Sequence, residues 1–119
     1  MSLLINIFIS DTGENSMAST EGFLCGVLEN LEGIDGISYR KMMGEYILYY
    51  KDKVVGGLYD DRLLIKPVRA AAELMLDAEY ELPYDGAKPM LRADENSGSE
   101  FFGKLFESMY DQLPDRRKK

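Results

Sequence analysis

The segment from Tyr39 to Pro67, YRKMMGEYILYYKDKVVGGLYDDRLLIKP, decides the fold class of this 119-residue chain. Apolar and polar residues alternate along it in short runs, and turn-forming residues separate the runs. An alternation with a period of two is typical of β-strands, and connections this short join only antiparallel neighbours. The segment therefore predicts an antiparallel meander, with strands expected at residues 37–43, 46–50, 54–59 and 62–66.

Two adjacent glycines, Gly56 and Gly57, lie inside the third expected strand, where glycine lowers the stability of a sheet. A simple register across the turn at residues 51–53 places them opposite Tyr49 and Leu48. Large side chains can fill the space that a glycine leaves on a sheet. A β-bulge at this point is the alternative.

The strand at residues 46–50 is apolar on both faces. Tyr46, Leu48 and Tyr50 share one face, and Ile47 and Tyr49 share the other. One face should pack on helices, and the second face then needs a further layer, a partner protein or a second copy of the chain to cover it. We therefore expect this sheet to carry an interaction surface.

Three helices are expected from apolar residues at helical spacing. The first follows a cap at Ser19 or Thr20. The second covers residues 69–78, and the third follows a capping box at residues 97–100 and ends at Pro114. A second hairpin is expected around a turn at Asp85 and Gly86. This order of elements predicts an α+β fold.

Composition and charge narrow the function classes. The chain has no histidine, which removes histidine-based nucleophile–base pairs and histidine-ligated zinc. Its single cysteine, Cys25, cannot form an internal disulfide, which favours a cytoplasmic location. Residues 40–69 carry seven basic and four acidic side chains, a net charge of +3, so the rest of the chain carries -10 of the total of -7. Because such a field repels a phosphate backbone, direct nucleic-acid binding is not expected.

The first sixteen residues look foreign to the domain. Met17 resembles a natural start, and the apolar run at residues 3–9 is too short to span a bilayer but is expected to add a strand to a sheet edge. We interpret residues 1–16 as an N-terminal extension or a vector-derived segment, residues 17–114 as a single domain, and residues 115–119 as a basic tail.

Three segments resemble the TfoX N-terminal domain family, the N-terminal domain of TfoX/Sxy-like competence regulators. Residues 40–44, RKMMG, resemble its R-x-M-[FM]-G motif, and residues 60–66, DDRLLIK, are similar to its D-D-R-L-x-x-K turn and strand. Residues 84–90, YDGAKPM, are similar to its Y-x-G-x-K-x-M stretch. The three segments occur in the family's order, and the resemblance covers residues 19–113.

The resemblance implies a two-layer α/β sandwich with an antiparallel sheet and the order α-β(3)-α-β(2)-α. This arrangement is akin to that of secretion chaperones, which work as protein-binding dimers. The resemblance also implies a regulatory role linked to natural competence and transcription. It supplies no catalytic residues to carry over.

The residues that could carry chemistry have simpler structural interpretations. Cys25 shares a helix face with glutamates, and neighbouring negative charge disfavours the reactive thiolate. The acidic pairs at residues 60–61 and 94–95 have the composition of turns and lack the further carboxylates of a divalent-metal site. We expect no catalytic residue, no cofactor and no metal.

Basic residues interleave with tyrosines in the meander. This pattern suits stacking on single-stranded nucleic acid or a protein interface, and the overall charge favours the interface. Met42 and Met43 are expected to fill the core. The expected interaction face consists of Tyr46, Tyr49, Tyr50, Tyr59, Arg40 and Arg62.

These observations predict a non-enzymatic, regulatory protein-interaction module that forms a homodimer or binds another protein. One alternative is a small-molecule-binding domain or weak enzyme that uses a pocket beside the sheet. A second alternative is a nucleic-acid accessory protein.

Overall fold

The computed structural model describes residues 20–114. The strand expected at residues 3–9, the proposed extension at residues 1–16 and the basic tail at residues 115–119 therefore lie outside the described residues. Within residues 20–114, no helix is long and apolar enough to cross a membrane.

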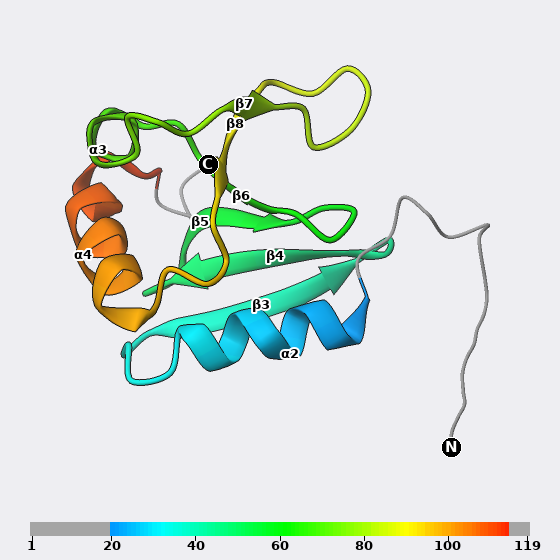
Figure 1. The fold of residues 1–119 in the computed structure, drawn as a ribbon, viewed down its shortest axis with the longest axis horizontal. Helices are drawn as coiled ribbons and strands as arrows, with labels where there is room; N and C mark the ends of the chain where they lie inside the picture. Colours follow the sequence, from blue (N-terminus) through cyan, green and yellow to red (C-terminus); the bar gives the residue numbers. More distant parts are fainter. Residues whose placement is uncertain (1–19, 115–119) are drawn as a thin grey trace.

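The predicted meander is confirmed and forms most of an antiparallel sheet of six strands (Figure 1). In spatial order the strands are β3 (Ile37–Met42), β4 (Glu45–Tyr50), β5 (Lys53–Leu58), β6 (Leu63–Ile65), β8 (Met90–Ala93) and β7 (Tyr80–Glu81). Among the described residues, β3 and β7 are thus the two edge strands. Four strands precede the second described helix, where the family resemblance implies three.

Three two-residue turns hold the meander together. Their residues all have positive φ: 53° and 86° at Met43 and Gly44, 50° and 70° at Lys51 and Asp52, and 55° at both Asp60 and Asp61. Two successive residues with positive φ are typical of the type I′ turn, whose twist matches that of the flanking strands. The expected three-residue turn at 51–53 is therefore one residue shorter.

The shorter turn changes the register that the sequence predicts for the two glycines. Gly56 lies opposite Leu48 and Gly57 opposite Ile47, and the register shifts by a bulge between Leu48 and Tyr49. The predicted pairing of the glycines with Tyr49 and Leu48 is therefore wrong by one residue, and the alternative of a bulge is confirmed.

A single core lies between the sheet and three described helices. The helices are α2 (Glu21–Asn30), α3 (Arg69–Leu74) and α4 (Ser99–Met109), and a short 3-10 turn, η2 (Tyr110–Gln112), extends α4. Figure 1 shows α3 and α4 side by side. Alternate sheet residues such as Tyr46, Leu48 and Tyr50 join buried side chains of all three helices in this core. The helices therefore cover the same face, here called the inner face, which confirms the expected α+β fold of two layers.

The helix ends agree with the sequence in part, and α3 ends at Leu74, four residues before the predicted end at residue 78. Thr20 caps α2 as predicted, because its hydroxyl accepts a hydrogen bond of 3.1 Å from the backbone N–H of Phe23. The predicted capping box at residues 97–100 is wrong. Gly98, with φ of 95°, precedes α4 without a side-chain cap, while the N–H of Ser97 bonds to Asp94 O in the preceding turn.

Candidate functional site

Two of the predicted interface tyrosines lie on the inner face and belong to the core. Tyr46 is 3% exposed and Tyr50 is 5% exposed. The hydroxyl of Tyr50 donates a hydrogen bond of 2.6 Å to Glu107 of α4, and its ring centroid lies 5.9 Å from that of Phe106. Both tyrosines therefore pack the sheet against the helices.

The other two tyrosines lie on the opposite, outer face. Tyr49 is 5% exposed and Tyr59 is 8% exposed. The Tyr59 ring covers Gly57, since a Cβ added to Gly57 would lie 2.8 Å from its Cε2 atom and 2.9 Å from its hydroxyl. A large side chain thus fills the space above a glycine, as the sequence predicts. The side chain is that of Tyr59, however, and not that of a residue opposite the glycines.

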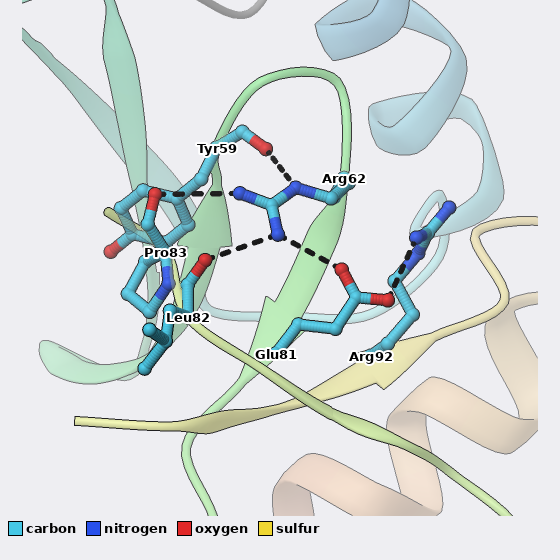
Figure 2. Close-up of polar contacts among 6 residues, drawn as sticks. All are labelled: Tyr59, Arg62, Glu81, Leu82, Pro83 and Arg92. Carbon is cyan, nitrogen blue, oxygen red and sulfur yellow. Dashed lines mark hydrogen bonds and ion pairs between the residues drawn. The ribbon is translucent and has the colours of Figure 1, made fainter. Parts of the chain in front are cut away.

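Arg62 joins the meander to the second hairpin (Figure 2). Its Nε donates to Tyr59 O at 3.0 Å, and its Nη1 donates to Glu81 Oε1 at 2.9 Å and to Leu82 O at 3.1 Å. Its Nη2 donates to Pro83 O at 3.4 Å. All three guanidinium nitrogens are therefore engaged within the domain, and the start of the loop at residues 82–89 is fixed against the β5–β6 turn.

Glu81 is shared between two arginines. Its second oxygen accepts a hydrogen bond of 3.2 Å from Arg92 Nη1. The Arg62 hydrogen bond, with further help from Arg92, lowers the pKa of Glu81 against the opposing effect of burial. Glu81 is consequently a carboxylate at neutral pH that links three segments of the chain.

The predicted interface residues therefore do not form one surface, and of the six only Arg40 is exposed. Arg40 lies in β3, where every side chain from Ser38 to Met42 is exposed. Tyr39 is 48% exposed, Met42 is 47% exposed, and Met43 in the following turn is 98% exposed. The prediction that Met42 and Met43 fill the core is wrong, because β3 is an edge strand and Met43 forms the tip of a two-residue turn.

A cavity of about 440 Å³ lies beside the Arg62 cluster. The β6–α3 connection lines it with Lys66, the loop at residues 82–89 lines it with Tyr84 and Lys88, and Tyr59 lines it from the sheet. The ring centroids of Tyr59 and Tyr84 are 6.4 Å apart. Burial, with smaller contributions from Glu45 and Tyr84, raises the pKa of Tyr59 to about 12, so its phenol is protonated at neutral pH.

The remaining candidates lie apart from this cavity. Cys25 is exposed on α2. Asp61 accepts a hydrogen bond of 2.8 Å from the N–H of Thr20, so the predicted turn also supports the start of α2. Asp94 accepts a bond of 2.9 Å from the N–H of Asn96, as in an Asx turn. Within residues 20–114, no three acidic or sulfur side chains are placed to hold a metal ion.

The sequence reasoning did not identify Tyr84, Lys88, Glu81 or Tyr39 as residues of a site. The first two lie in a segment already noted for its family resemblance, but their side chains meet Tyr59 only through the pairing of β6 with β8. The sequence indicated weakly that Tyr39 is exposed, because it lies in the first expected strand of the meander. No local pattern marks Glu81, which acquires its role from two distant arginines.

Comparison with known proteins finds a relative that is similar to part of this chain. The chain is 47% identical, over 55 residues, to a Spirochaeta aurantia protein described as an uncharacterized 12.7 kDa protein in the trpE 5′ region. The match covers 46% of this chain and 48% of the relative, so the chain spans about half the length of that protein. No profile of a known protein family matches the chain, and no solved structure matches it.

Proposed function

We propose that this chain is a non-enzymatic, regulatory protein-interaction module of the TfoX N-terminal type. It works in the cytoplasm and forms a homodimer through the edge strand β3. The observation that carries this proposal is the exposure of β3, whose side chains from Ser38 to Met42 are exposed on both faces of the sheet. The segments that resemble the family support it further, since RKMMG at residues 40–44 lies in β3 and its turn.

An exposed edge strand offers a row of backbone donors and acceptors to a further strand. Among the described residues, only β4 pairs with β3. Burial of the exposed apolar side chains of Tyr39, Met42 and Met43 stabilises a dimer relative to its monomers. The gain is on the order of 1.5–3 kcal/mol for each side chain that is fully buried. This gain opposes the entropic cost of association and favours a weak dimer, with a Kd in the micromolar range or above.

Charge selects the register of such a dimer. If a two-fold axis runs perpendicular to the sheet, one residue of β3 lies opposite its own copy. A register centred on Arg40 or Lys41 places like charges directly opposite each other, which is unfavourable. A register centred on Tyr39 pairs two tyrosines and places Ser38 opposite the second copy's Arg40. We therefore propose the register centred on Tyr39.

The non-enzymatic part of the proposal rests on how the polar groups are used. Glu81 accepts hydrogen bonds from both Arg62 and Arg92, and Arg62 also donates to backbone carbonyls, which makes these side chains structural ties. The three side chains hold the second hairpin against the meander, and this structural use of their charges supports the proposal.

Two substitutions at one exposed position test the proposal in opposite directions. Ser38→Glu places a carboxylate opposite the second copy's Arg40 and should lower the dimer Kd, whereas Ser38→Arg should raise it. Each cross-strand pair contributes about 0.2–1 kcal/mol and occurs twice in the dimer, so we expect changes of roughly two- to thirtyfold. Sedimentation velocity over a concentration series measures these constants.

Leu76→Arg is the matched control, because Leu76 is 83% exposed but lies beyond α3 and away from β3. It should leave the dimer Kd unchanged. A wild-type chain that stays monomeric at millimolar concentration contradicts the proposal, as does an equal effect of Ser38→Glu and Ser38→Arg.

A further inference from the structure

The cavity beside the Arg62 cluster is bounded by a loop whose start is held in place by Arg62. Its outer wall is the loop at residues 82–89, and Arg62 holds the start of that loop through the carbonyls of Leu82 and Pro83. Pro83 is buried next to the ring of Tyr59 (Figure 2). A volume of about 440 Å³ lies within the range of sites that bind small molecules. The cavity therefore exists before any ligand arrives.

The charge in the cavity has one sign. Lys66 and Lys88 line it, and no aspartate or glutamate does. Neither lysine side chain forms an ion pair or a hydrogen bond with the described part of the chain. Two unpaired ammonium groups on a protein of net charge -7 make this a local site of attraction for anions.

Tyr59 supplies an unused hydrogen-bond donor. The residue is only 8% exposed, and within residues 20–114 its hydroxyl has no hydrogen-bond partner. Buried hydroxyls are normally hydrogen-bonded, because an unsatisfied buried donor costs free energy. The raised pKa of about 12 keeps this phenol protonated and able to donate.

The rest of the lining is mostly apolar and includes three prolines. It also includes the ring of Tyr84 and the side chain of Met90. Aromatic and proline surfaces favour a planar apolar group, which can stack between them.

We infer that this cavity is a binding site for a small organic anion with a planar apolar body, such as an aromatic carboxylate. The two lysines hold the anionic group, the Tyr59 hydroxyl donates to it, and the planar body lies against Tyr84 and Pro89. The site is independent of the β3 edge, because it lies on the far side of the sheet order, at β6 and β8.

Titration of the full chain with 2-naphthoate tests this inference, with the amide signals of the ¹⁵N-labelled protein as the readout. We expect saturable shifts confined to the residues around Tyr59, Lys66 and the loop at 82–89, with a Kd below about 1 mM. The uncharged 2-naphthamide should bind about tenfold more weakly, because it cannot form charge-assisted hydrogen bonds. Inorganic phosphate alone should bind weakly, because it leaves the apolar walls uncovered.

Single substitutions measure how much each lysine and the Tyr59 hydroxyl contribute to binding of 2-naphthoate. Lys66→Gln and Lys88→Gln should each weaken binding of 2-naphthoate about tenfold, and Tyr59→Phe should weaken it severalfold. Lys104→Gln is the control, because Lys104 is exposed on α4 and outside the cavity. The lysine variants keep the test valid if Tyr59→Phe fails to fold.

Several outcomes would overturn the inference. Among them are equal affinity for the carboxylate and the amide, shifts located elsewhere in the domain, and the same loss of affinity in Lys104→Gln as in Lys66→Gln. Absence of any saturable shift at about 10 mM 2-naphthoate would overturn it as well.

Discussion

Arg62 and Glu81 show how charged residues on a sheet can stabilise their own domain by bonding to each other. Their side chains are 19% and 26% exposed, and the pair joins the end of the β5–β6 turn to β7 with a contact of 2.9 Å. An ion pair of this kind is only partly screened by water and also fixes the loop that walls the cavity. The exposed pair of Arg69 and Glu73 on α3, at 83% and 66% exposure, lacks both properties.

The lowered pKa of Glu81 leads to a prediction about pH. A carboxyl whose folded pKa lies below its ordinary value of 4.5 contributes stability that is fully present above that value. This stability disappears as the pH falls through the folded pKa. Glu81→Gln should therefore lower the free energy of unfolding by about 1–3 kcal/mol at pH 7, and the difference from wild type should narrow below about pH 4.5.

Urea unfolding of wild type and variant between pH 7 and pH 3 measures this difference. Glu73→Gln is the matched control and should cost no more than about 0.5 kcal/mol at pH 7. A Glu81→Gln difference that is the same at pH 7 and pH 3 would show that the charge of Glu81 plays no part.

At the scale of elements, the meander depends on three tight turns and on two glycines that let neighbouring strands approach closely. A Cβ at Gly56 would lie 2.1 Å from the carbonyl oxygen of Leu64, and a Cβ at Gly57 would lie 2.7 Å from that of Tyr46. Backbone atoms cannot move aside as a flexible side chain can. The glycines are therefore required for the pairing of β5 with both of its neighbours.

Alanine substitution at two glycines should have opposite effects. Gly56→Ala forces β5 away from β6 and should lower the free energy of unfolding by about 1–3 kcal/mol or more. Gly26→Ala should raise it by about 0.5–1 kcal/mol, because Gly26 lies in α2 with no neighbouring atom within 4 Å of an added Cβ. Denaturant unfolding of both variants gives the two values. A neutral Gly56→Ala would mean that β5 and β6 lie further apart than described.

The elements that the sequence predicted well are those that local patterns determine. Alternation, turn residues and helical spacing identified the meander, the three helices and the fold class. The register across β4 and β5 was off by one residue, because a two-residue turn and a bulge at Leu48 cannot be distinguished from a longer turn by pattern alone. The start of α4 was also predicted wrongly. The sequence indicated a capping box at residues 97–100, whereas the residue before the helix is Gly98, which has a positive φ and provides no side-chain cap.

The candidate site was harder to predict than the fold. Tyr46, Tyr50 and Arg62 are residue types that are common at interfaces. In the fold, however, the two tyrosines are buried in the core, and Arg62 bonds to the loop at residues 82–89. Whether a tyrosine faces solvent depends on which helix or loop covers it, and that information is not local. The exposed methionines at residues 42 and 43 were missed because an edge strand has the same pattern as a central one.

At the scale of the whole molecule, the sheet has one face buried by helices and a β3 edge that is unpaired among the described residues. The side chains of β3 are exposed, whereas those of the central strands β5 and β6 are largely buried. An exposed edge strand can pair with a further strand through its free backbone groups. Separately, residues 40–69 carry a net positive charge, whereas the rest of the chain is acidic. The exposure of β3 is the property on which the proposed dimer rests.

Hydrogen exchange of the backbone amides, measured over a range of protein concentrations, tests the role of β3 most directly. If β3 pairs with its own copy, those amides of residues 38–42 that point away from β4 should exchange more slowly as the concentration rises through the dimer Kd. The amides of β7, the other edge strand in the described part of the chain, should exchange at an unchanged rate. Exchange in β3 that does not depend on concentration, or new protection that appears at β7 instead, would contradict the account.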